Sequence, residues 1–141
     1  MQRVLPLFVL AAFAAGNAAR ADEKKVDPKL LGAGRGLYLE HCAPCHGTAG
    51  KGNGPVADAL KTLPSDLTAL VDKEGRFPAE RVRTYIDGTQ AATAHGTREM
   101  PIWGKVFSKA GITHDEGAAA AKLFTLVEYV RSIQPTPTVT K

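Results

Sequence analysis

The feature that most constrains this chain is the run Cys42-Ala43-Pro44-Cys45-His46, which contains both of its cysteines. Two thiols at this spacing on a helical turn can add to the two vinyl groups along one edge of a haem. The next residue, His46, then lies beneath the ring with an imidazole nitrogen directed at the iron. The run therefore predicts one covalently bound haem c, with Cys42 and Cys45 as thioether positions and His46 as proximal ligand.

Three other chemistries use the same residue types. A redox-active dithiol normally follows a strand in a thioredoxin-like pattern, and no such pattern precedes Cys42. A zinc site needs a second thiolate pair or more histidines at ligand spacing, which two cysteines do not provide. A plain disulfide between Cys42 and Cys45 is the remaining interpretation. Covalent haem is favoured over all three.

Iron held by one histidine needs a ligand on its other face. Apart from Met1, the only methionine is Met100, which lies between Glu99 and Pro101 in a predicted loop rather than on an apolar helix face. A lone methionine often only fills a core, but this position suits a ligand. A thioether favours ferrous iron and raises the reduction potential. We therefore predict that Met100 is the distal iron ligand.

The three other histidines compete for that position. His41 adjoins the first attachment cysteine and is not expected to reach the opposite face of a haem. His114 is expected on the surface, in the first turn of the closing helix. His95 is the serious rival, because it lies in the same loop five residues before Met100. Whether His95 replaces Met100 in any state stays open at this point.

The first 21 residues have the pattern of a secretory signal peptide. Arg3 gives a positive start, residues 4–15 are apolar, and the small residues Ala19 and Ala21 occupy the positions that a signal peptidase reads. We expect cleavage after Ala21 and a periplasmic location. The alternative is an uncleaved anchor, although the apolar stretch is short for a membrane span.

Cleavage changes what the composition implies. Arg3 and Arg20 leave with the signal, so the formal charge of +4 falls by two and no longer argues for a nucleic-acid partner. No membrane span is expected after cleavage. Residues 22–133 are then expected to form one domain. Residues 134–141, rich in proline and threonine, are expected to be a flexible tail, with a docking peptide as the alternative.

The hydrophobic pattern predicts an all-α domain of three to five helices. Asp27-Pro28 is a helix start, and apolar residues follow at helical spacing as far as His41. Further helices are predicted at 55–61, 78–87 and about 113–133, with loops at 47–54 and 88–104. Thr113 and Glu116 form a possible capping box. Only 6% of the residues are aromatic, so a porphyrin is expected to complete the core.

Three features have the spacing found in class I c-type cytochromes: the small residue Gly34, the aromatic residue Tyr38 and the cysteine run as attachment motif. The chain resembles this family over nearly the whole domain. Leu126 and Tyr129 stand at the usual aliphatic and aromatic positions of the closing helix. The segments 64–68 and 100–104 are similar to those of periplasmic monohaem members.

This resemblance implies a cytochrome c fold around one haem, with the first and last helices crossing near Gly34. It also implies that the carbonyl of Gly54-Pro55 accepts a hydrogen bond from His46. The implied function is single-electron transfer, without enzymatic activity of its own, between a dehydrogenase or membrane complex and an oxidase or reductase. Such a protein is either a free shuttle or the cytochrome subunit of a complex. The alternative is a haem enzyme or gas sensor with a displaceable sixth ligand.

Two further groups of side chains have open interpretations. Six basic residues either surround the exposed haem edge and steer an acidic partner or are scattered solvated charges: Lys51, Lys61, Arg81, Arg83, Arg98 and Lys105. Tyr38 and Trp103 are expected to pack on porphyrin and helices, and either could also bind a propionate.

Overall fold

The computed structural model describes residues 26–89, 99–109 and 116–135, and no strand occurs within these ranges. The described elements, in chain order, are α1 (Pro28–His41), α2 (Ala43–His46), the 3-10 helix η1 (Ala57–Ala59), α3 (Ala79–Asp87), α4 (Trp103–Lys109) and α5 (Glu116–Ser132). The prediction of an all-α fold is therefore confirmed. Among the described residues, no helix has the length and apolar character that a membrane crossing requires.

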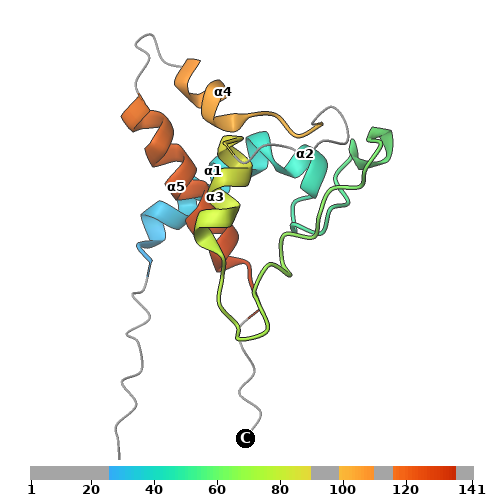
Figure 1. Cartoon of the computed structure of the whole chain (residues 1–141), viewed down its shortest axis with the longest axis horizontal. Coiled ribbons are helices and arrows are strands. Elements are labelled where there is room, and N and C mark those ends of the chain that lie inside the picture. The colour runs from blue at the N-terminus through green and yellow to red at the C-terminus, as the bar shows by residue number, and fades with distance from the viewer. Residues whose placement is uncertain (1–25, 90–98, 110–115, 136–141) are drawn as a thin grey trace, which may run out of the picture.

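The first and last helices, α1 and α5, form the main helix pair of the domain and cross each other (Figure 1). They approach closely at Gly34, where a Cβ atom would lie 2.5 Å from the carbonyl oxygen of Thr125 and 2.8 Å from Cβ of Tyr129. Any larger residue would force the helices apart. The crossing near Gly34 that the resemblance implies is thus confirmed.

An aromatic and aliphatic core fills the space between α1, α4 and α5. Its largest fully buried side chains are Tyr38 and Leu126. The ring of Tyr38 packs on that of Tyr129, with centroids 5.1 Å apart. From α4, Phe107 is buried and stacks with Trp103 at a centroid distance of 5.7 Å. Burial of these large rings is a major stabilising contribution in a domain with few aromatic residues.

Local start and stop signals place α1 and α3 as predicted. The carboxylate of Asp27 accepts a hydrogen bond from the amide of Lys29 at 2.8 Å, and Pro28 is the first helical residue. Helix α3 ends at Gly88, whose φ of +86° is a conformation that other residues rarely adopt.

Two predicted boundaries differ from the structure. The helix expected at 55–61 is reduced to η1, because the amide of Val56 donates to the carbonyl of Pro44 and the backbone is already extended at Leu60. The loop expected at 88–104 ends before Trp103, where the unpredicted helix α4 begins. Gly104 lowers the helix propensity of this segment, and contacts of Trp103 and Phe107 with the core stabilise it instead.

The C-terminal boundary also moves. Helix α5 ends at Ser132, but Gln134, predicted to open a flexible tail, is half-buried and hydrogen-bonded to Leu67, Leu70 and Val130. The attached domain thus extends at least to Gln134. Four stretches lie outside the described residues: 1–25, 90–98, 110–115 and 136–141. They contain the predicted signal peptide, Thr113 and the rest of the tail.

Candidate haem site

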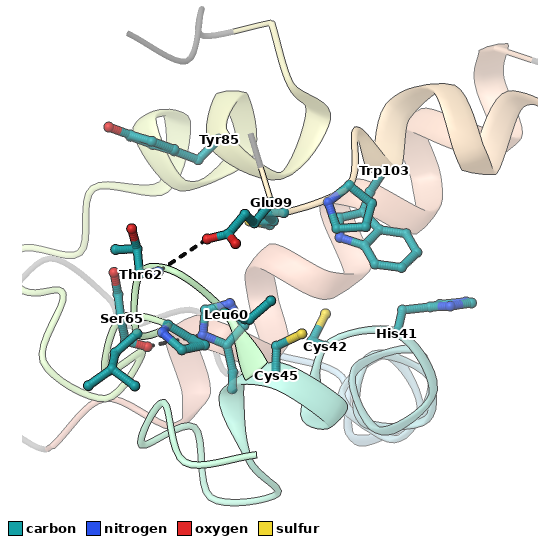
Figure 2. A pocket seen from close by; sticks show the side chains of 14 residues that line it. His41, Cys42, Cys45, Leu60, Thr62, Ser65, Tyr85, Glu99 and Trp103 are labelled. Carbon is teal, nitrogen blue, oxygen red and sulfur yellow. Dashed lines mark hydrogen bonds between the residues drawn. The ribbon is translucent and has the colours of Figure 1, made fainter. Parts of the chain in front are cut away.

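The attachment motif occupies one turn of helix. Cys42 precedes α2, and its carbonyl oxygen accepts hydrogen bonds from the amides of Cys45 and His46 at 3.1 and 2.9 Å. Residues three apart share a helix face, and Figure 2 shows both sulfurs directed to the same side. Both thiols are free, so the disulfide interpretation is not supported.

The Cys42 thiol does not have the electrostatic environment of a redox-active cysteine. Burial, with a smaller contribution from the nearby Cys45, raises the pKa of the Cys42 thiol to about 12. Redox-active cysteines instead have lowered pKa values, because the thiolate is the nucleophile. Within the described ranges, no cluster of three or more His, Cys, Asp or Glu side chains could hold a metal ion.

A backbone carbonyl orients the imidazole of His46. The Nδ1 atom lies 3.0 Å from the carbonyl oxygen of Ser65. A carbonyl can only accept, so Nδ1 carries the proton in this bond. The lone pair that binds a metal is then on Nε2. Metal-ligating histidines typically have such a partner, which fixes the ring and increases the basicity of the ligating nitrogen.

The expectation that Gly54-Pro55 supplies this carbonyl is therefore wrong. Gly54 packs on the backbone of α2 instead, and its amide donates to the carbonyl of Cys45 at 2.9 Å. A Cβ atom at Gly54 would lie 2.6 Å from the carbonyl oxygen of Ala43. The glycine thus permits close contact between the loop and the attachment turn.

Two hollows, of about 310 and 440 Å³, lie beside α2, and Figure 2 shows the side chains that line the smaller one. Both are lined by Cys42, His46, Ser65, Tyr85 and Met100, so they are parts of one space, which we call the α2 cleft. Most other lining residues are apolar, as in pockets for apolar cofactors. The α2 cleft thus brings the attachment turn, the oriented histidine and the methionine to one apolar space, a donor set that fits a covalent haem.

The segment that carries Met100 is tied to the loop after η1. The carboxylate of Glu99 accepts hydrogen bonds from the amides of Lys61 at 2.9 Å and Thr62 at 3.2 Å, and Figure 2 shows the bond to Thr62. These bonds hold Met100 at the wall of the α2 cleft. Its rival His95 lies outside the described residues, as does His114.

His41 is placed differently from Met100. It lines only the smaller hollow, and its ring packs against Trp103 and Phe107, with centroids 5.0 and 5.3 Å away. This residue therefore contributes to the contact between α1 and α4.

The buried hydroxyl of Tyr38 donates to the carbonyl of Gly47 at 2.6 Å and so connects α1 to the end of α2. Burial is the main reason that the pKa of Tyr38 is raised to about 12. This bond gives Tyr38 a structural partner in place of the propionate considered above. Trp103 lines the smaller hollow, which agrees with the expectation that it packs on the porphyrin.

The basic residues make local contacts on separate elements. Lys51 lies 3.3 Å from Asp66, and Arg83 pairs with Glu80 at 2.6 Å. Arg81 lines the larger hollow of the α2 cleft. The ion pairs favour the interpretation of scattered charges for Lys51 and Arg83, whereas Arg81 lines the cleft; Arg98 lies outside the described residues.

Sequence reasoning missed two residues of the site. Ser65 contributes only its main-chain oxygen, so its side-chain type carries no signal for this role. Glu99 could have been found, because a carboxylate beside the candidate ligand Met100 is an evident anchor for a loop.

The helical fold and this site define a class I c-type cytochrome. Residues 30–114 match the family model described as "Cytochrome C oxidase, cbb3-type, subunit III", and the chain belongs to that family. Membership implies covalently bound haem c and haem-based electron transfer. No curated protein and no solved structure matches the chain.

Proposed function

We propose that the chain is a periplasmic electron carrier whose haem is attached to Cys42 and Cys45 and ligated by His46 and Met100. The observation that supports this most is the shared lining of the α2 cleft by the attachment turn, His46 and Met100. The hydrogen bond from His46 to Ser65 adds to it, because it leaves Nε2 to the iron.

The bound haem supplies an iron that gains or loses one electron. His46 and Met100 would both hold the iron and so leave it no ligand position for a substrate. Both ligands are neutral and are held by their surroundings, His46 by Ser65 and Met100 by the anchored Glu99. A ligand set that is the same in both oxidation states favours rapid outer-sphere electron transfer.

The partner and the location belong to the same proposal. The family description names an oxidase, which supports an oxidase as the electron acceptor. A dehydrogenase or membrane complex would supply the electrons, and the chain would act as a free shuttle or as a cytochrome subunit. We further propose export directed by residues 1–21, with the mature protein starting at Asp22.

The ligand assignment is tested with Met100→Ala in the haem-loaded protein. We expect loss of the weak sulfur-to-iron charge-transfer band at the red end of the spectrum and a lower reduction potential. The matched control is His95→Ala, which should keep both properties. If His95→Ala removes the band and Met100→Ala does not, the assignment of the distal ligand is wrong.

A second measurement separates an electron carrier from a haem enzyme or gas sensor. The reduced native protein should bind added carbon monoxide slowly and incompletely, because Met100 would already ligate the iron. Rapid and complete binding would support a displaceable ligand and contradict electron transfer as the main function.

A further inference from the structure

We propose that Gln134, just beyond α5, is a positioning residue for His46 and acts through residues 65–70, which we call the carbonyl segment. The inference rests on the proposed role of His46 as the proximal iron ligand. It concerns how the C-terminal end of the domain sets the properties of that ligand.

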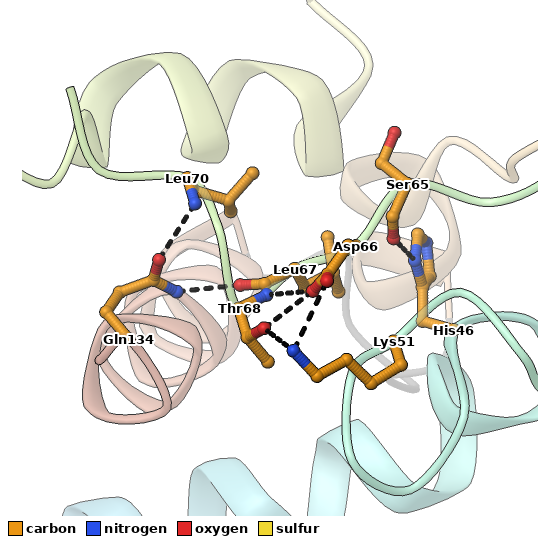
Figure 3. Close-up of polar contacts among 8 residues, drawn as sticks. All are labelled: His46, Lys51, Ser65, Asp66, Leu67, Thr68, Leu70 and Gln134. Atoms are coloured by element: carbon orange, nitrogen blue, oxygen red, sulfur yellow. Dashed lines mark hydrogen bonds and ion pairs between the residues drawn. The ribbon is translucent and has the colours of Figure 1, made fainter. Parts of the chain in front are cut away.

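The side-chain amide of Gln134 ties the carbonyl segment to α5 (Figure 3). Its Nε2 atom donates to the carbonyl oxygens of Leu67 at 2.7 Å and Val130 at 2.8 Å. Its Oε1 atom accepts a hydrogen bond from the amide of Leu70 at 2.9 Å. Glutamine supplies both the donors and the acceptor that these three contacts require, whereas an ionised carboxylate could only accept.

The loop after α2 holds the carbonyl segment from its other side (Figure 3). The carbonyl of Gly50 accepts a hydrogen bond from the amide of Leu67 at 2.6 Å. Lys51 donates to the hydroxyl of Thr68 at 2.5 Å and to the carboxylate of Asp66 at 3.3 Å. Leu67 is therefore held through its amide by one neighbour and through its carbonyl by Gln134.

Ser65 is two residues before Leu67, so these ties restrict where its carbonyl oxygen lies. That oxygen accepts the Nδ1 proton of His46 at 3.0 Å. A carbonyl that accepts this proton makes the imidazole a more basic ligand, and a more basic ligand favours ferric over ferrous iron. Gln134, 67 residues from Leu67 along the chain, thus helps to keep the reduction potential low.

A purely structural role for Gln134 would be to bond the last turn of α5 through Val130. Ser132 offers a matched control for that role, because its hydroxyl donates to the carbonyl of Tyr129 at 2.7 Å at the same helix end. Its contact does not involve the carbonyl segment. Loosening the helix end alone should therefore occur in Ser132→Ala as well as in Gln134 variants.

The experiment uses the haem-loaded protein with Gln134→Ala, Gln134→Glu and Ser132→Ala. A redox titration gives the midpoint potential, and NMR of the reduced protein gives the exchange rate of the His46 Nδ1 proton with solvent. We expect a higher potential in Gln134→Ala, several-fold faster exchange in both Gln134 variants, and wild-type values in Ser132→Ala. The near-isosteric Gln134→Glu keeps the test valid if Gln134→Ala does not fold.

Two results overturn the inference alone: unchanged potential and exchange in the folded Gln134 variants, or equal changes in Ser132→Ala. The same spectra test the underlying assignment separately. Ring protons of His46 that show no displacement by the haem ring current would mean that His46 is not the proximal ligand. The proposed site and the inference would then both fail.

Discussion

The carbonyl oxygen of Ser65 lies 3.0 Å from Nδ1 of His46, although the two residues are 19 positions apart. The contact uses the main chain of Ser65, so its side chain is not required. We predict that Ser65→Ala leaves the midpoint potential and the thermal midpoint of unfolding close to those of the native protein. A large change in potential would mean that the hydroxyl, rather than the carbonyl, acts on His46.

Gly34 should be far less tolerant of substitution than Gly36 in the same helix. A Cβ atom at Gly34 would be 2.5 Å from the carbonyl oxygen of Thr125, whereas one at Gly36 would meet nothing within 4 Å. We predict that Gly34→Ala lowers the free energy of unfolding by about 1–3 kcal/mol through overpacking. Gly36→Ala should raise it, by up to about 1 kcal/mol, through helix propensity. Denaturant titrations measure both, and equal effects would contradict the described helix crossing.

The main helices could be predicted because their signals are local. Asp27 and Pro28 mark the start of α1, Gly88 marks the end of α3, and a small residue at Gly34 agrees with a helix crossing. Helix α4 could not be predicted in this way, because its stability comes from contacts of Trp103 with residues distant in the chain. Propensity alone does not contain such tertiary contacts.

Loss of the Glu99 anchor should loosen the distal ligand. Its carboxylate accepts amide hydrogen bonds from Lys61 and Thr62, and a neutral amide is a weaker acceptor. We predict that Glu99→Gln increases the rate at which carbon monoxide binds to the reduced holoprotein. The control is Glu74→Gln, which removes only an exposed contact with Arg76. Equal rates in the two variants would show that Glu99 does not restrain Met100.

Asp66 should make stability depend on pH in the acid range. Hydrogen bonds from the side chain and amide of Thr68, with a smaller contribution from Lys51, lower the pKa of Asp66 below its ordinary value of 3.8. A lowered folded-state pKa means that this stabilisation is complete well above pH 4 and is lost as the pH falls through the folded-state value. Asp66→Asn should therefore be less stable than the native protein at pH 7, with the difference vanishing on acidification.

Denaturation curves at several pH values measure this difference. Asp58→Asn, an exposed change in η1, serves as the control for the loss of a surface carboxylate elsewhere in the domain. A constant difference for Asp66→Asn from pH 7 to strongly acidic conditions would contradict the prediction.

Without haem, the chain should lose most of its tertiary structure. The apolar walls of the α2 cleft would then be open to water, and few aromatic residues are present to close it. We predict weak near-ultraviolet circular dichroism for Cys42→Ala/Cys45→Ala prepared without haem. A spectrum and a cooperative unfolding transition like those of the holoprotein would contradict this.

The parts of the candidate site that were evident from sequence are those whose side chains perform chemistry. Cys42, Cys45 and His46 are recognisable because their spacing suits a single task. The contacts that orient His46 were not evident, since Ser65 uses a main-chain atom and Gln134 stands in a segment with the composition of a tail. Such roles depend on chain geometry, which residue type does not specify.

The packing of α1 on α5 also sets the order in which the domain can be completed. Gly34 meets Thr125, so the partner surface of the first helix lies in a distant part of the chain that is synthesised well after it. Until α5 is in place, Tyr38, whose hydroxyl bonds to the end of α2, lacks its ring contact with Tyr129. Packing of the first helix and ordering of its contact with the attachment turn therefore both depend on the last described helix.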